Sequence, residues 1–145
     1  MTDLIGAHTK FRRSEEQIGV CRSILADACQ GVASFELRFD GSILSPGGVL
    51  VKGYYREGLS ALRERIRYLS NARGFSLQER YQSISAHMTL MRFAAPPADK
   101  RRLLTFIEKH RLGDLGRMEV RRCTLVLHDW YNRRKEVLGV FTLTG

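Results

Sequence analysis

The chain has 145 residues, of which 43% are hydrophobic and 27% are charged, as is typical of a soluble globular protein. This length favours one domain with a sizeable core, and no apolar run is long enough for a membrane span or a signal segment, so we expect a cytoplasmic protein without membrane attachment. The 24 Lys and Arg against 15 Asp and Glu give a net charge of +9, which favours a phosphorylated or polyanionic partner. The cysteines form no Cys-x-x-Cys pair and are interpreted as small buried residues in a reducing compartment: Cys21, Cys29 and Cys123.

The first half of the chain predicts a helix, two strands and a second helix. Ser14 and Gln17 form a capping-box pattern, so a helix is expected from there to about Gln30, followed by Gly31. Alternating residues predict strands over 35–39 and 49–55, with turns at 40–41 and 45–48. Apolar residues at helical spacing then predict a helix from Leu59 that stops at Gly74. The charged residues expected on its outer face are Arg63, Glu64, Arg65 and Arg67.

The second half predicts a strand around His87, a helix and two strands. The helix follows Asp99 and ends near His110, where a cation favours the helix C-terminus, so we expect a structural role for this histidine. Residues 118–128 are predicted to form one long strand, 129–135 a charged turn and 137–143 a closing strand. This order favours a single α+β domain over residues 1–145, with helices packed on one side of each sheet.

The strand around His87 has two faces of opposite chemistry. Successive strand side chains point to opposite sides, so the apolar residues share one face and the small polar ones share the other. The first set is Ile84, Ala86, Met88 and Leu90, and the second is Ser83, Ser85, His87 and Thr89. Such alternation is expected where the apolar face is covered and the other face is open, which makes the strand half-buried. An imidazole and a hydroxyl two residues apart can address neighbouring atoms of one small anion.

The segment His87-Met88-Thr89-Leu90-Met91-Arg92-Phe93 closely resembles the second signature of the two-histidine phosphoesterases, the family of 2′-5′ RNA ligases and cyclic nucleotide phosphodiesterases. The resemblance covers roughly residue 35 to the C-terminus. It implies two lobes of antiparallel sheet with helices on the outer faces and a central cleft. Each lobe contributes one His-x-Thr strand, and the pair acts on a 2′,3′-cyclic phosphate or a 2′-5′ linkage without a metal or other cofactor.

The counterpart of the first signature is predicted at Gly6-Ala7-His8-Thr9-Lys10-Phe11, and it departs from the family pattern. Lys10 stands two residues after His8, where the family has a hydroxyl, and it can contact a phosphate as a point charge. Few residues precede this motif, so either the reading frame is short or the N-terminal lobe is reduced. The resemblance implies that His87, Thr89 and His8 are catalytic. The two histidines would act as the base for the attacking water and the acid for the departing oxygen, and Thr89 would hydrogen-bond a non-bridging phosphate oxygen.

Further candidates flank this site. The resemblance makes Arg92 part of the signature, but a direct phosphate contact requires the strand to end or bulge near Met91. Trp130 and Tyr131 are candidates for stacking on a base, with an aromatic plug at a strand end as the competing interpretation, and His128 precedes them. No metal site is expected, because the histidines lack short ligand spacing and no acidic cluster accompanies them.

The sequence therefore predicts a phosphodiesterase or RNA-end-processing enzyme that acts on RNA ends or nucleotides carrying a cyclic phosphate. A catalytically weakened nucleotide- or RNA-binding module with the same fold is the alternative, and an interaction protein that only retains the fold is a third. The direction of the reaction, the base preference and the oligomeric state are not predicted.

Overall fold

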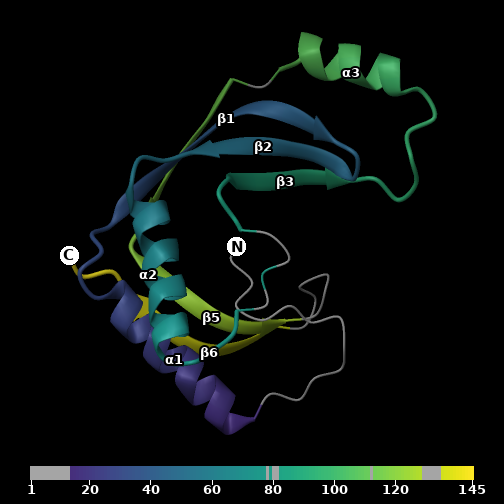
Figure 1. Cartoon of the computed structure of the whole chain (residues 1–145). Helices are drawn as coiled ribbons and strands as arrows, with labels where there is room; N and C mark the ends of the chain where they lie inside the picture. Colours follow the sequence, from purple (N-terminus) through teal and green to yellow (C-terminus); the bar gives the residue numbers. More distant parts are fainter. Residues whose placement is uncertain (1–13, 78, 80–81, 112, 129–134) are drawn as a thin grey trace. The chain divides into compact units, whose positions relative to one another are not determined.

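The computed structural model describes residues 14–77, 79, 82–111, 113–128 and 135–145. In chain order its elements are α1 (Glu15–Cys29), β1 (Phe35–Ser45), β2 (Gly48–Tyr54), α2 (Gly58–Ala72), β3 (Ala86–Arg92), α3 (Lys100–Lys109), β4 (Asp114–Val120), β5 (Arg122–His128) and β6 (Lys135–Thr142) (Figure 1). The predicted α+β class is confirmed. The chain divides into two compact units, one containing α1, α2, β5 and β6 and the other containing β1 to β3, α3 and β4.

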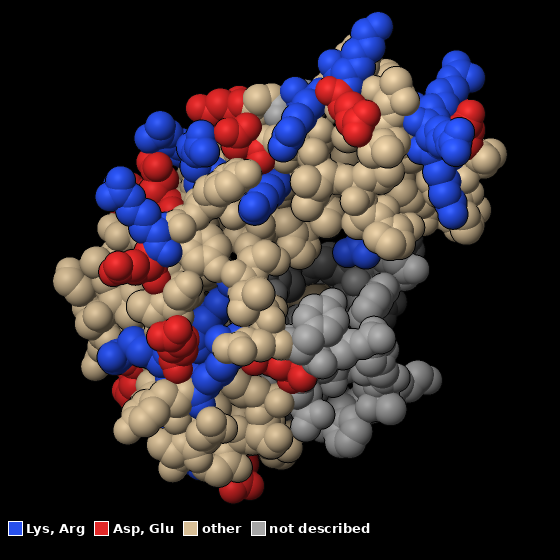
Figure 2. Space-filling view, turned by 45° about the horizontal axis from the view of Figure 1, so that its top comes forward, with Lys and Arg blue, Asp and Glu red and all other residues tan. Residues whose placement is uncertain are grey.

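Two predictions concern the helices and the surface: the absence of a membrane span and an anionic partner. No helix among the described residues is long and apolar enough to cross a membrane. Basic and acidic side chains are intermixed on the face shown in Figure 2, without a broad region of a single sign. The positive net charge is therefore not concentrated into one extended patch on this face, and any anion site must be found from local geometry.

The first unit is built around α1, which begins as the sequence predicts. The Ser14 hydroxyl accepts from the Gln17 backbone N–H at 3.2 Å, and the Gln17 side chain accepts from the Ser14 N–H at 3.3 Å. Helix α1 contacts α2, β5 and β6, because its apolar stripe faces all three. The buried core of this unit consists of Cys21, Ile24, Leu25, Ala28, Cys29, Val32, Leu62, Ile66, Leu125 and Leu143.

Helix α2 corrects the predicted outer face at two positions, Arg63 and Arg67, since the Arg67 side chain is only 20% exposed. Arg63 was expected to face solvent but is buried, with 5% of its surface exposed, whereas Glu64 is exposed as predicted. The Arg65 guanidinium donates to the carbonyls of Asp27, Ala28 and Gln30, at 2.9–3.2 Å, at the end of α1 where helix carbonyls lack internal partners. The buried face of α2 is thus wider than its apolar stripe, because the helix also contacts polar backbone groups.

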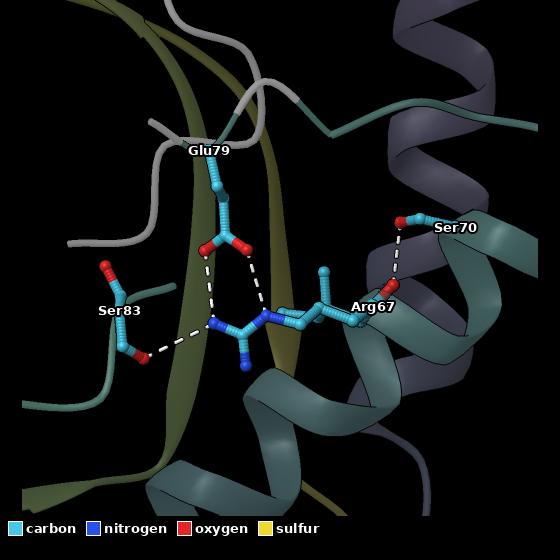
Figure 3. A network of polar contacts seen from close by, with 5 residues as sticks. Arg67, Ser70, Glu79 and Ser83 are labelled. Atoms are coloured by element: carbon cyan, nitrogen blue, oxygen red, sulfur yellow. Dashed lines mark hydrogen bonds and ion pairs between the residues drawn. The ribbon is translucent and has the colours of Figure 1, made fainter. Parts of the chain in front are cut away.

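Arg67 binds the segment that precedes β3 (Figure 3). Its guanidinium makes two hydrogen bonds to the Glu79 carboxylate, at 2.9 and 3.1 Å, and a third to the Ser83 carbonyl at 3.3 Å. This pairing lowers the pKa of Glu79 and raises that of Arg67. Both side chains are mostly buried, with 20% of Arg67 and 15% of Glu79 exposed. A bidentate ion pair of this kind fixes the geometry of both side chains.

The three cysteines are free thiols, as predicted, with Cys21 and Cys29 buried and Cys123 half-buried. The Cys29 thiol interacts with that of Cys123. This contact lowers the pKa of Cys123, and together with burial it raises the pKa of Cys29. The pair lies where the end of α1 meets β5, so these cysteines belong to the core of the first unit.

The second unit contains a four-stranded sheet with the order β3-β2-β1-β4, and α3 lies on one side of it (Figure 1). The turn predicted at 40–41 is wrong: β1 continues through this point with a bulge at Gly41, whose φ of +68° is a conformation that glycine adopts readily. The chain reverses instead at Pro46 and Gly47, inside the second predicted turn, where Ser45 opposes Gly48.

The strand predicted over 118–128 is divided in two. Strand β4 ends at Val120 in the four-stranded sheet, and β5 begins at Arg122 in a separate two-stranded sheet with β6. Between them the Arg121 carbonyl accepts from the Leu143 N–H at 2.9 Å. The alternation of residues continues across the break, so local sequence does not reveal that the two halves pair with different partners.

We predict that Arg67→Met lowers the free energy of unfolding by about 1–3 kcal/mol at neutral pH, the range for a hydrogen bond to a charged group. Stability is lost because the variant leaves the largely buried, charged Glu79 carboxylate without the Arg67 guanidinium that neutralises it. Since the pKa of Glu79 is lowered by folding, its contribution is complete above the unfolded-state pKa of about 4.3 and is lost as the pH falls through the folded-state value. The difference between wild type and variant in urea denaturation should therefore narrow in acid.

Arg117→Met is the matched control, because the Arg117–Glu36 pair at 3.4 Å is more than half exposed on both sides and should contribute little. An Arg67→Met effect equal to that of the control, or unchanged between pH 7 and pH 3, would contradict the prediction.

Candidate active site on the four-stranded sheet

The pairing of β2 with β3 places Lys52 beside His87. The two strands are antiparallel, and Lys52 is the direct cross-strand partner of His87, while Leu50 is the partner of Thr89. Directly opposed residues share a face of the sheet and have Cα atoms about 4.5–5.5 Å apart. On the far side of Lys52, strand β1 contributes Asp40. A row of three side chains, Asp40, Lys52 and His87, therefore crosses the sheet.

A bulge in β3 brings Arg92 to the same face. The register passes from Leu50 opposite Thr89 to Val49 opposite Met91, which leaves Leu90 as an additional residue. One added residue reverses the alternation, so Arg92, the partner of Gly48, shares a face with Leu50 and Lys52. For Arg92 to reach the face of His87, the strand had to end or bulge near Met91, and the bulge at Leu90 meets this condition.

Glycine at position 48 permits this arrangement. A Cβ atom there would lie 2.0 Å from the Met91 carbonyl oxygen, far inside any normal contact. After the bulge the pairing continues, since the Phe93 N–H donates to the Gly47 carbonyl at 3.0 Å. The close approach of β3 to β2 beside Arg92 therefore depends on the absence of a side chain.

The polar face of this sheet is defined by Arg38, Asp40, Lys52, Tyr54, His87, Thr89 and Arg92. The opposite face contains Leu37, Val49 and Val51, which are buried, and Val51 is completely so. Met88 is the partner of Val51 and lies on this second face, as the alternation predicts. The orientation of His87 and Thr89 away from the core of the sheet therefore follows from the register.

The predicted burial of the apolar residues of this strand is wrong. Met88 and Leu90 are 42% and 46% exposed, and Ile84, which precedes β3, is 76% exposed. Strand β3 lies at the edge of the sheet and has only β2 as a neighbour, so its side chains are covered from one side. Leu90, moreover, is the bulge residue and no longer follows the alternation.

Two cations lie against the ring of Tyr54, one row away from His87. The Arg38 guanidinium carbon is 5.2 Å from the ring centroid, and the Lys52 ammonium nitrogen is 4.8 Å from it. Arg38 also forms an ion pair with Asp40 at 3.1 Å. At an exposed site a cation–π contact stabilises by about 0.5–1 kcal/mol, which is enough to bias the orientation of a side chain.

Sequence reasoning missed Arg38, Lys52 and Tyr54. The alternation of Val51, Lys52, Gly53 and Tyr54 shows that Lys52 and Tyr54 share a face, but it does not show which residue of which strand lies beside them. The register of two strands more than thirty residues apart in the chain supplies that information.

The remaining candidates lie elsewhere. His8, Lys10, Trp130 and Tyr131 are outside the described residues. His110 follows the last turn of α3, as predicted, and its ring lies against Phe106 with a centroid distance of 4.5 Å. His128 is the last residue of β5 and belongs to the other unit.

The chemistry available on the polar face is that of an anion site. Beside the His87 imidazole and the Thr89 hydroxyl it offers two cations, Lys52 opposite His87 and Arg92 beyond Thr89, and Arg38 lies one row farther along the sheet. In the part of the chain that the structure describes, no group of three or more His, Cys, Asp or Glu side chains is arranged to hold a metal ion.

No family model and no curated protein matches this sequence. Among solved structures, the crystal structure of TT0787 of Thermus thermophilus is similar to this chain, with a TM-score of 0.59 and 18% sequence identity. The similarity covers 92% of this chain and 74% of that one. At this level of identity it shows a related fold, which includes elements of both units.

We predict that Gly48→Ala weakens the pairing of β2 and β3. The added methyl group overlaps the Met91 carbonyl, and strain of this kind lowers the free energy of unfolding by roughly 1–3 kcal/mol. Gly47→Ala is the matched control, since a Cβ atom at that position meets nothing within 4 Å. Urea denaturation of both variants measures the difference, and equal stability of the two would contradict the close approach.

Proposed function

We propose that this protein is a phosphodiesterase or RNA-end-processing enzyme that acts on 2′,3′-cyclic phosphates or 2′-5′ linkages by acid–base catalysis without a metal. The observation that supports it best is the exposed polar face on which His87 and Thr89 are joined by Lys52 and Arg92. The signature in β3 resembles that of the two-histidine phosphoesterases, and the observed α+β architecture with antiparallel sheets agrees with the fold that this resemblance implies. In this proposal residues 1–145 act as one functional domain.

In the proposed reaction His87 exchanges a proton with the reacting oxygen. Water attacks phosphorus, a P–O bond to the 2′ or 3′ oxygen of ribose breaks, and the departing oxygen takes up a proton. One histidine removes the proton of the water and the other supplies the proton to the leaving group. Histidine suits both roles because its ordinary pKa lies near neutrality. We assign the second histidine to His8.

The other residues of the site stabilise charge. The Thr89 hydroxyl donates to a non-bridging phosphate oxygen, on which negative charge grows in the transition state. Arg92 and Lys10 attract the phosphate, Arg92 with the geometry to donate two parallel hydrogen bonds and Lys10 as a point charge. Trp130 and Tyr131 are proposed to stack on a base.

One observation favours the second candidate function, a nucleotide- or RNA-binding module with little or no turnover. Lys10 replaces the hydroxyl two residues after His8, so the first half-site lacks a group that both donates and accepts. Such a module binds RNA in a salt-sensitive manner through its cations but does not hydrolyse it.

We predict that His87→Ala lowers kcat/KM for a 2′,3′-cyclic mononucleotide by at least about 10²-fold, the usual contribution of one general acid or base. Steady-state hydrolysis measures the loss. His110→Ala is the matched control, because this histidine lies at the end of α3 and contacts Phe106. Hydrolysis by a folded His87→Ala protein at the wild-type rate would refute the phosphodiesterase assignment, whereas RNA binding without any turnover in the wild type would favour the binding module.

A second prediction is that hydrolysis persists in excess chelator. Two imidazoles and a hydroxyl provide the proton transfers and the charge stabilisation that the proposed reaction requires. Rates measured with and without EDTA should agree within about twofold, well below the contribution of a general acid or base. Complete inhibition that zinc or magnesium reverses would exclude this mechanism.

A further inference from the structure

The row of side chains next to His87 has the composition of a nucleotide subsite. Tyr54 is 40% exposed and lies on the polar face two residues from Lys52, the partner of His87. Residues two apart on a strand are separated by about 6.5–7 Å, so the Tyr54 row is within reach of a nucleotide joined to a phosphate at His87.

Lys52 and Arg38 are held beside this ring. Lys52 contacts Tyr54 at 4.8 Å, and Arg38 contacts both Tyr54, at 5.2 Å, and the Asp40 carboxylate. These contacts are weaker than the stacking of a base on an aromatic ring, so a base can replace a cation at the ring. Lys52 lies in the row of His87 and Arg38 lies one row away, so either cation is available to a phosphate once it is displaced from the ring.

The charges of the polar face favour a substrate with more than one phosphate. Strands β1 to β3 present Arg38, Lys52 and Arg92 on this face, and β4 adds Arg117, which pairs with Glu36. Arg38 pairs with Asp40, and Glu119 shares the face of Arg117 because it follows two residues later in β4. These four cations outnumber the three carboxylates, so the face keeps an excess of positive charge. One terminal phosphate at His87 neutralises only part of that positive charge. A phosphodiester backbone that continues across the sheet neutralises more of it.

We propose that Tyr54, Lys52 and Arg38 bind the nucleotide that precedes the terminal cyclic phosphate, so that the chain prefers the end of an RNA strand to a free cyclic mononucleotide. The Tyr54 ring stacks on the base, and Lys52 and Arg38 contact the phosphodiester that joins the two nucleotides. This inference rests on the proposed function, since it takes the terminal phosphate to lie at His87 and Thr89.

The test compares two substrates, a 2′,3′-cyclic mononucleotide and a trinucleotide that ends in the same cyclic phosphate. Tyr54→Ala should lower the ratio of kcat/KM for the trinucleotide to kcat/KM for the mononucleotide by about 5- to 100-fold, the loss of one stacked base. Tyr54→Phe keeps the ring and should keep the ratio. Tyr68→Ala is the matched control, since Tyr68 is 72% exposed on α2 in the other unit.

Arg38→Gln should likewise lower the ratio and reduce its dependence on salt, whereas Arg101→Gln removes the same charge from α3 and should not. A wild-type enzyme that hydrolyses both substrates through His87, with the same ratio in Tyr54→Ala, would overturn the subsite and leave the proposed function standing.

If the wild type hydrolyses neither substrate, the proposed function fails, and fluorescence anisotropy with a labelled trinucleotide 3′-phosphate decides the subsite. Weaker binding by Tyr54→Ala than by Tyr54→Phe would then support it. Equal binding, or no binding by any of the proteins, would overturn it.

Discussion

The antiparallel pairing of β2 with β3 is the interaction on which the candidate site depends. It places Lys52 opposite His87, and the bulge at Leu90 then brings Arg92 onto the same face. Because side chains alternate along a strand, a shift of one residue in this register would turn the whole set toward the other face of the sheet. The close approach at Gly48 and the completely buried Val51 both favour the observed register, the first by contact geometry and the second by burial of apolar surface.

The bulge resolves a conflict inside the β3 sequence. In a regular strand His87, Thr89 and Met91 would share one face, and Met88, Leu90 and Arg92 the other. The charged Arg92 would then lie with the apolar residues of the sheet, and Met91 with the polar ones. An additional residue between Thr89 and Met91 exchanges the two, so that the guanidinium reaches the polar face. Local disruption of the ladder is the cost of gathering an imidazole, a hydroxyl and a guanidinium on one short strand.

The segment before β3 is anchored within the first unit. Arg67 binds both Glu79 and the carbonyl of Ser83, and the chain passes into the second unit between Ile84 and Ser85. The anchor therefore lies immediately before the strand that contains the candidate site. Its role is structural, since a largely buried ion pair fixes the chain just before it enters the second unit.

The sequence alone determined the features that depend on near neighbours in the chain. The Ser14 capping box, the start of α3 after Asp99 and the alternation that gives His87 and Thr89 one face are local, and each was predicted from residues a few positions apart. Tertiary structure decided what depends on distant partners. These features are the burial of Arg63, the division of the strand at Arg121, the edge position of β3 and the placement of Lys52, Tyr54 and Arg38 on the same face as His87. The physical reason is that strand register and sheet order join residues tens of positions apart. Periodicity within one segment shows which residues share a face but not which strand lies beside them.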